Sequence, residues 1–377
     1  MTKHRQLWPL FVALVAGAAH YCYLFFYAGG SHRVGWDSYY YNLMAAGGQV
    51  GSPYNLRVVV PWLAGHLAAL FNTDTLTAFR LTTPLCLLAA LCALWLLLQR
   101  AAVPLFPQAV LLLGVALQIA RYGGQPILTD PLLLLLACLI ALCLQSERAL
   151  LALPLVCLAA LTKEYGILLL LPWAACAYPL RRSLLWLLLL PLAVWLGMRG
   201  TPQGVDTQGD FLRYALTYNL QPFYDLGVLR AAQALLLTLW TALWPIYLLA
   251  AVGVFRAWRA GTMSTFTRCC AALLLALPIS FCGDLERSVV LFLPFALVVA
   301  GTVSLANART LYTALLVGFV AVGYAHTGTG ISALPFVLRA AFHFGLAALS
   351  LYVSIQALGL PRKRAVTSSE PRLAQAS

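Results

Sequence analysis

Long apolar runs separated by short polar segments dominate this chain. After a first run from about Leu7 to Tyr27, further runs fall near 78–98, 103–120, 127–144, 149–162, 166–180, 183–198, 229–254, 266–282, 288–305, 310–324 and 332–358. A bilayer core of about 30 Å takes roughly 20 apolar residues in a helix. Because lipid offers no hydrogen bonds to the backbone, leucine-rich runs of this kind predict helices. The pattern predicts an all-α, polytopic transmembrane bundle of about ten to twelve spans.

The segment between the first two runs, from about Ala28 to Thr77, predicts a long first extracytoplasmic loop. Its early part is polar, and a short apolar stretch follows from Arg57 to Leu67 with Trp62 and His66 inside it. This stretch is too short to span, and it predicts a short helix at the membrane interface, with Trp and Arg at headgroup depth. Ala16-Gly17-Ala18 resembles a signal-peptidase site, but the apolar run continues beyond it, so we expect a retained anchor.

Composition agrees with a membrane protein and fixes its orientation. The chain is 62% hydrophobic and 9% charged, with a formal net charge of +13. With the N-terminus in the cytoplasm, nearly all of the net positive charge falls on the cytoplasmic side, as the positive-inside rule requires. We therefore expect an inner (plasma) membrane protein with both termini cytoplasmic. The charge reports topology and contact with membrane lipids, and it gives no sign of nucleic-acid binding.

Most acidic residues fall on the opposite, outer side in this topology. They are Asp37, Asp74, Asp130, Glu164, Asp206, Asp210, Asp225, Asp284 and Glu286. Ionisable groups at membrane depth are costly and suggest function. The alternative is that acidic residues simply occupy exposed outer loops.

The first candidate group lies in the first outer loop, where Asp37 stands beside Tyr39 and Tyr40. A carboxylate can take the proton of a hydroxyl that attacks an anomeric carbon, and aromatic rings offer faces to a sugar. Asp37 is thus a candidate catalytic base, with Tyr39 and Tyr40 as substrate-binding residues. The alternative is an interfacial aromatic belt with an incidental Asp.

Two further groups lie at the outer ends of predicted spans. Asp130, followed by Pro131, is either a helix N-cap or part of a site. Lys163 and Glu164 share one very short turn. Lys163 is a candidate for holding a lipid-linked phosphate as a point charge, or the two side chains neutralise each other.

The fourth group is Asp284, Glu286 and Arg287. The planar guanidinium of Arg287 suits a phosphate. Asp284 and Glu286 are a weak candidate pair for a divalent cation, and no other cofactor is predicted. The alternative is a structural ion-pair cluster.

Taken in order, these groups resemble the GT-C class of integral-membrane glycosyltransferases of bacterial type. The resemblance rests on Asp37 after an anchor helix, on Pro53-Tyr54-Asn-Leu-Arg57-Val-Val-Val-Pro61-Trp-Leu-Ala, on Asp130-Pro131, on Thr162-Lys163-Glu164, and on Arg287 with Pro294. It implies a transmembrane catalytic module over 1–300, followed by further helices over 301–360 and a basic, disordered cytoplasmic tail over 361–377.

The resemblance also implies an activity. A sugar would move from a polyprenyl-phosphate-linked donor to an envelope glycan, lipid or protein acceptor on the outer face. Asp37 would be the catalytic base, with Arg57, Asp130, Lys163, Glu164 and Arg287 around the substrates. The first loop lacks the paired acidic motif of some members, which leaves metal use open.

Two other function classes fit the composition. A transporter or flippase of a lipid-linked or small polar substrate would place ionisable residues near mid-span and show paired halves with broken helices. A non-catalytic membrane component of an envelope-assembly complex is the third class. The sequence carries no HExxH, GxSxG, GxxxxGK[ST] or GxGxxG motif, which argues against metal hydrolysis and nucleotide-driven work.

Overall fold

A computed structural model describes residues 4–27, 36–50, 54–180, 182–199, 224–280, 289–305, 308–325 and 334–359. Over these ranges the regular elements are α-helices and short 3-10 helices, without a strand. The all-α prediction is therefore confirmed.

The N-terminal half alternates long and short helices. Its elements are α1 (His4–Phe26), α2 (Trp36–Ala45), η1 (Tyr54–Leu56), α3 (Val59–Leu70), α4 (Thr75–Arg100), α5 (Leu105–Ile119), η2 (Ala120–Gly124), α6 (Asp130–Gln145), α7 (Ala149–Thr162), η3 (Glu164–Leu169), α8 (Leu170–Leu180), η4 (Arg182–Leu188) and α9 (Leu189–Arg199).

The C-terminal half has fewer short connecting helices. Its elements are α11 (Val228–Thr241), α12 (Trp244–Arg259), α13 (Thr265–Ser280), η5 (Val289–Leu291), α15 (Leu293–Thr302), α16 (Ala308–Ala325) and α17 (Phe336–Gly359). These boundaries follow the predicted apolar runs closely, with one exception described below.

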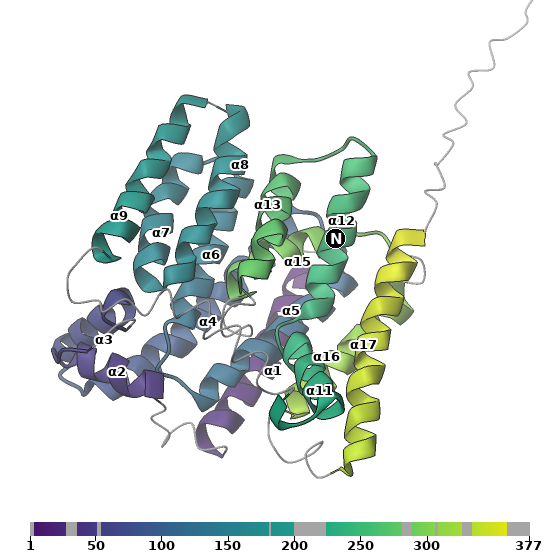
Figure 1. The fold of residues 1–377 in the computed structure, drawn as a ribbon, viewed down its shortest axis with the longest axis horizontal. Coiled ribbons are helices and arrows are strands. Elements are labelled where there is room, and N and C mark those ends of the chain that lie inside the picture. Colours follow the sequence, from purple (N-terminus) through teal and green to yellow (C-terminus); the bar gives the residue numbers. More distant parts are fainter. Residues whose placement is uncertain are drawn as a thin grey trace, which may run out of the picture.

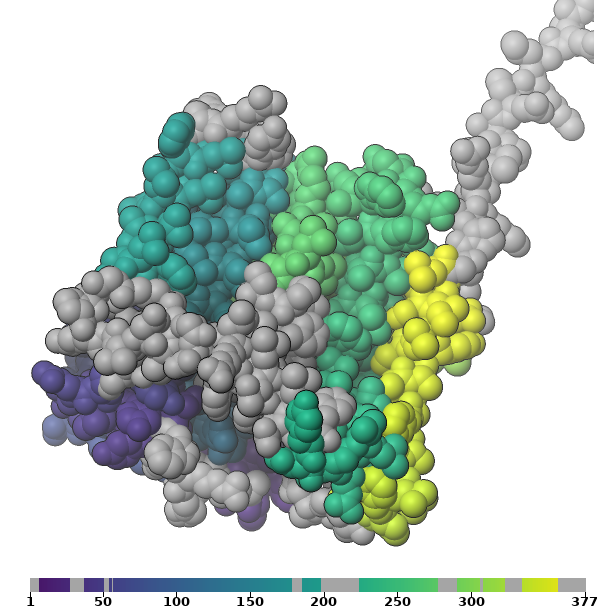
Figure 2. Space-filling view, viewed as in Figure 1, coloured from purple at the N-terminus to yellow at the C-terminus, as the bar shows by residue number. Residues whose placement is uncertain are grey.

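The helices form a bundle whose two sides are built from different groups of helices (Figure 1). Helices α6 to α9 stand together at one side, and α2 and α3 lie across one end of this group, where α3 contacts α7. Helices α11, α16 and α17 form the other side. The space-filling view shows the purple segment that contains α2 and the yellow α17 at opposite sides of the molecule (Figure 2).

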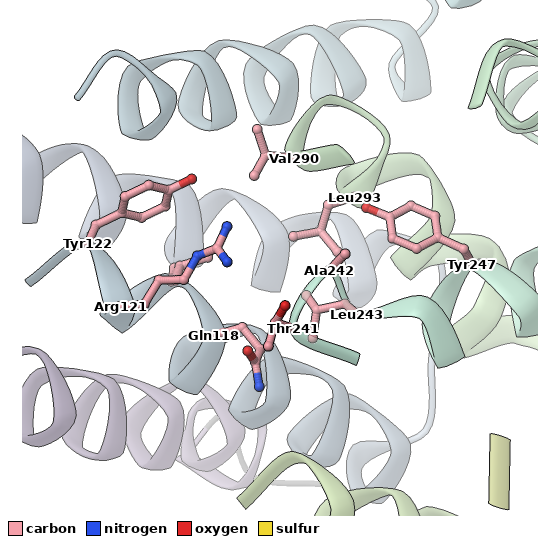
Figure 3. Close-up of a pocket in the computed structure, with 10 residues that line it drawn as sticks. Gln118, Arg121, Tyr122, Thr241, Ala242, Leu243, Tyr247, Val290 and Leu293 are labelled. Carbon is pink, nitrogen blue, oxygen red and sulfur yellow. The ribbon is translucent and has the colours of Figure 1, made fainter. Parts of the chain in front are cut away.

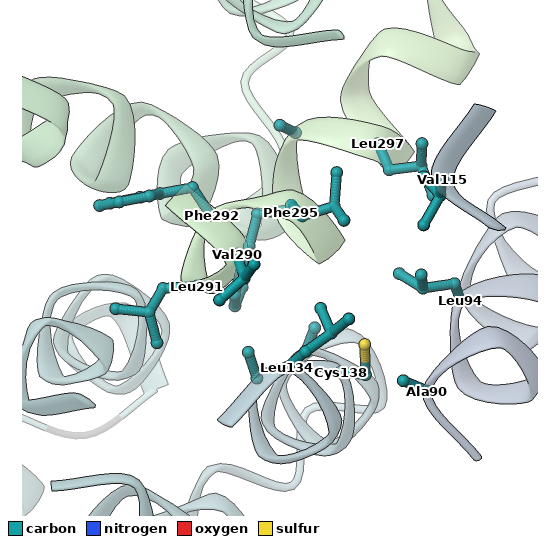
Figure 4. Close-up of a cluster of buried hydrophobic side chains, with 14 of the residues drawn as sticks. Ala90, Leu94, Val115, Leu134, Cys138, Val290, Leu291, Phe292, Phe295 and Leu297 are labelled. Carbon is teal, nitrogen blue, oxygen red and sulfur yellow. The ribbon is translucent and has the colours of Figure 1, made fainter. Parts of the chain in front are cut away.

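The centre of the bundle is α15. Every residue from Leu293 to Gly301 is buried, and a helix that is apolar on all sides is stable only when other helices surround it. Figure 4 shows Leu297 next to Val115 of α5, with Leu134 and Cys138 of α6 and Ala90 and Leu94 of α4 around the same core. This core holds the two sides of the bundle together.

Four helical segments are long and apolar enough to cross a membrane. They are Leu7–Phe26, Thr75–Arg100, Leu105–Gly124 and Phe336–Leu358. A fifth is possible if α11 and α12 count as one bent span. The remaining predicted spans coincide with apolar helices of 10–17 residues. The described residues therefore support several membrane-crossing helices, and the total of ten to twelve stays a prediction.

The predicted span over 229–254 is not one straight helix. The run is broken into α11 and α12, which meet at 68°, and Leu243 between them adopts a left-handed backbone with φ of 61°. Pro245 explains the position of the break, because its ring would clash with the carbonyl of residue 241 in a continuous helix. Helix α11 ends at Thr241, the residue that this clash would involve.

Candidate active site

Arg57 connects the first loop to the short turn after α7 through an ion pair with Glu164. Arg57 directly follows η1 in the chain, and the residue is 8% exposed. Its Nε donates to Glu164 Oε2 at 2.8 Å, and its Nη2 donates to Glu164 Oε1. Its Nη1 donates to the hydroxyl of Tyr41 at 2.6 Å. Two parallel bonds to one carboxylate fix the geometry of both partners.

Electrostatics keep this pair charged. Burial alone would raise the pKa of Glu164, but the charge and hydrogen bonds of Arg57 outweigh it and lower that pKa to about 2. Burial alone would lower the pKa of Arg57, and the Glu164 carboxylate reverses this and raises it. The pair therefore remains ionised across the physiological range.

Asp37 is linked to Arg57 through Tyr54, which contacts both residues. The Tyr54 hydroxyl donates to Asp37 Oδ1 at 2.9 Å. The Tyr54 ring stacks on Tyr40 with ring centres 4.4 Å apart, and the Arg57 guanidinium carbon lies 5.7 Å from the Tyr54 ring centre. Burial and the neighbouring Asp37 charge raise the pKa of Tyr54, so the phenol keeps its proton and remains a donor. Tyr54 thus orients the Asp37 carboxylate.

The predicted aromatic residues differ in exposure. Tyr39 is 58% exposed and meets Tyr40 edge to face, with ring centres 5.5 Å apart. Tyr40 is half-buried between Tyr39 and Tyr54. Tyr40, three residues after Asp37 on α2, lies on the same helix face as the carboxylate, whereas Tyr39, two residues after it, lies on a different face.

Lys163 and Asp130 form a second ion pair, which is almost completely buried. Lys163 Nζ donates to Asp130 Oδ1 at 2.7 Å, and the side chains are 3% and 0% exposed. This corrects two alternatives from the sequence. Asp130 is the first residue of α6 and Thr129 is the cap residue, so the position of Asp130 does not match the predicted N-cap. Lys163 and Glu164 do not simply neutralise each other, since each has a partner from a distant segment.

Local packing explains how the turn holds both ion pairs. A Cβ on Gly166 would lie 2.0 Å from the carbonyl oxygen of Ala159, so only glycine lets η3 fold this closely against α7. The Gly166 amide donates to the Lys163 carbonyl at 2.8 Å. The indole of Trp195 on α9 donates to the Glu164 carbonyl at 3.2 Å. Lys163 and Glu164 therefore point to different partners from a rigid turn.

These contacts define an ionic cluster from four separate segments. The cluster consists of Asp37, Tyr54, Arg57, Glu164, Lys163 and Asp130. Ser38 adds a further link between α2 and the segment before α6, since its hydroxyl donates to the Ile127 carbonyl at 3.2 Å. The sequence predicted five of these residues as site residues, but the role of Tyr54 was missed, although the motif around Arg57 contains it.

Arg287, Asp284 and Glu286 lie outside the described residues. The first described element after them, η5, contacts both η3 and α6. Among the residues that the structure describes, no three His, Cys, Asp or Glu side chains gather as a metal site. The predicted cation pair therefore stays a prediction.

A small pocket with both polar and apolar lining residues lies where α11 breaks into α12 (Figure 3). Its polar lining residues are Gln118, Arg121, Tyr122, Thr241 and Tyr247. Gln118 is 3% exposed, and neither polar atom of its amide has a hydrogen-bond partner among the described residues. With a volume of about 20 Å³, the pocket has room for about one water. Sequence reasoning missed it, although Pro245 within an apolar run was the available signal.

Comparison with known proteins adds no relative. No family model matches the chain, and no curated protein or solved structure matches it. The function must therefore be argued from the chain's own residues.

Proposed function

We propose that this protein is a multi-pass membrane glycosyltransferase of GT-C type, acting on the extracytoplasmic face of the inner membrane. It transfers a sugar from a polyprenyl-phosphate-linked donor to an envelope glycan, lipid or protein acceptor. The observation that carries the proposal is the convergence of Asp37, Glu164 and Asp130, from segments far apart in the chain, into one cluster with Arg57.

In this proposal Asp37 is the catalytic base. Its carboxylate takes the proton of the acceptor hydroxyl while the hydroxyl oxygen attacks the anomeric carbon of the donor sugar. The bond between that carbon and the phosphate oxygen breaks, and the polyprenyl phosphate leaves with the electron pair. The Tyr54 hydroxyl, bonded to Asp37 at 2.9 Å, holds the carboxylate in position for this step.

The other cluster members position the base and do not touch the reacting atoms. The two bonds from Arg57 to Glu164 tie η1, and with it Tyr54, to the turn after α7. Lys163 is nearly buried against Asp130, so the proposal gives it a structural role in place of the phosphate contact predicted from the sequence. In the proposal the donor phosphate is bound by Arg287, which precedes η5 in the chain.

The orientation is part of the proposal. Arg100, Arg256 and Arg259 stand at or near the C-terminal ends of α4 and α12, opposite the ends that carry Asp74 and Leu243. A cytoplasmic location for these arginines agrees with the positive-inside rule and puts the ionic cluster outside. A reporter that is active only outside should be active near Gln208 and silent after Arg364.

One observation favours a second function, transport of a lipid-linked or small polar substrate. The break between α11 and α12, with Gln118 and Arg121 among the residues that line the pocket beside it, is the kind of discontinuous helix that transporters use for binding. The pocket's volume of about 20 Å³ is too small for a sugar, which is why transfer is the first proposal.

A single experiment separates the two functions. Membranes that contain the protein would be incubated with polyprenyl phosphates that carry labelled sugars, and label would be followed in the acceptor and across sealed vesicles. Transfer should appear with the unmodified protein and disappear with Asp37→Asn, which is nearly isosteric. Movement of labelled lipid across the vesicles without transfer to an acceptor would replace the proposal with transport.

A further inference from the structure

An apolar cavity lies between α1, α4 and α5, away from the ionic cluster. Its volume is about 400 Å³, within the range of about 300–1,000 Å³ typical of ligand pockets. None of the residues that line it belongs to the ionic cluster or to the pocket at the α11–α12 break, apart from Ile119, which borders both spaces. The cavity is therefore a separate candidate site.

The lining is suited to hydrocarbon. Its residues are mainly aliphatic and aromatic, among them Tyr21, Phe25 and Phe26 of α1 and Leu88 of α4, together with Arg80. Ala18, Leu88 and Phe26 are also exposed on the surface of α1 and α4, so the cavity is open at the side. In a membrane this side faces the acyl chains of the bilayer.

The small residues of α1 create part of the space. Gly17 packs so closely on α5 that a Cβ there would lie 3.1 Å from the Ala116 Cβ. Ala18 beside it presents only a methyl group to the cavity. The helices approach at Gly17, while the larger rings of Tyr21 and Phe25 line the same cavity further along α1.

Among the lining residues, Arg80 alone carries a full charge. Its guanidinium carbon lies 5.8 Å from the ring centre of Phe25. Arg80 stands six positions after Asp74, the N-cap of α4, which corresponds to about 9 Å along the helix axis. A long arginine side chain at this depth reaches toward the headgroups and favours an anionic group there.

We propose that this cavity binds an anionic phospholipid of the surrounding bilayer. One acyl chain occupies the space between α1, α4 and α5, and the lipid phosphate lies at the Arg80 guanidinium. The occupant follows from the combination of a side-open hydrocarbon lining with one cation near its outer end. The inference does not depend on the proposed transferase activity.

The test is lipid retention by the purified full-length protein, measured by native mass spectrometry. The protein would be equilibrated with equimolar phosphatidylglycerol, phosphatidylcholine and polyprenyl phosphate. The unmodified protein should retain phosphatidylglycerol in preference. Arg80→Gln should lower that retention roughly fivefold, since one arginine near anionic lipid contributes about that factor, while Arg80→Lys should preserve most of it.

A second variant tests the cavity without changing charge. Ala18→Phe fills the space from its open side and should lower retention of phosphatidylglycerol even though Arg80 is intact. Arg230→Gln is the matched control, because Arg230 also lies over a phenylalanine ring, at 5.3 Å from the centre of Phe336, but does not line the cavity. It should bind lipid as the unmodified protein does.

Three results would overturn the proposal. Retention by Arg80→Gln equal to that of the unmodified protein would remove the role of the charge. Retention by Ala18→Phe equal to that of the unmodified protein would place the lipid elsewhere. Preferential retention of polyprenyl phosphate, lost in Ala18→Phe, would show that the occupant is the isoprenoid lipid.

Discussion

Asp37 and Asp74 lie in the same predicted loop and differ in what holds them. Among the residues that the structure describes, Asp74 bonds within its own helix start, where it accepts from the Thr77 amide at 2.8 Å and from the Thr77 hydroxyl at 2.6 Å. Asp37 accepts from Tyr54, which leads through Arg57 to Glu164 in a turn 107 residues away from Arg57. The Asp74 carboxylate caps the start of one helix, whereas the Asp37 carboxylate takes part in contacts between separate segments.

The difference shows why residue type alone is a poor guide to a site. Both aspartates lie in the segment that the sequence predicts as the first outer loop, and by residue type alone either fits a solvated side chain. An N-cap needs only the next turn of its own helix. A cluster such as that of Asp37 requires several segments to be fixed at once, which costs conformational entropy.

Removal of the Lys163 charge should have the largest effect on stability, because it breaks a contact between distant segments and not a local helix cap. Lys163→Met leaves Asp130 buried without its cation, and breaking a buried pair in this way costs about 3–5 kcal/mol. Thermal unfolding in detergent should show a large drop in Tm. Arg100→Met is the control, because Arg100 bonds to Ser146 at an exposed site and should change stability little.

The same pair allows a rescue. Replacing both partners, Lys163→Met with Asp130→Leu, removes the unpaired charge and should recover most of the lost stability. A Tm for Lys163→Met equal to that of the unmodified protein would show that the buried pair does not hold α6 to the turn after α7.

The next effect concerns Glu164 and acid. Its pKa is lowered from 4.5 to about 2 in the folded protein, so it binds a proton more readily when unfolded. The stabilisation is complete above about pH 4.5 and is lost as pH falls toward 2. Glu164→Gln removes this contribution, so its Tm should fall less steeply between pH 4.5 and 3 than that of the unmodified protein. Identical slopes would contradict the role of Arg57.

The smallest effect concerns Asp74. Asp74→Ala removes the capping bonds to Thr77 and should cost about 1 kcal/mol of stability, while Asp74→Asn keeps a capping oxygen and should cost only a few tenths. Both variants should retain the activity of the unmodified protein. Loss of activity in Asp74→Asn would mean that both aspartates act in one site.

The sequence predicted the helices well because apolar runs in lipid permit few other structures. It missed the break at Leu243, because a hydropathy window does not register that Pro245 would clash with the carbonyl of Thr241. It grouped Asp37, Arg57, Asp130, Lys163 and Glu164 from a resemblance. The sequence did not show which carboxylate pairs with Lys163. Whether the partner is Glu164 or Asp130 depends on how Gly166 lets η3 pack on α7.

We propose that Asp37 is the base for sugar transfer. The most direct measurement is the initial rate of sugar transfer from a polyprenyl-phosphate donor by Asp37→Asn and Asp74→Asn, at matched amounts of folded protein. Asp37→Asn should lower the rate by about 10²–10⁴, as loss of a general base does, and Asp74→Asn should leave it unchanged. Equal rates for Asp37→Asn and the unmodified protein would contradict the claim.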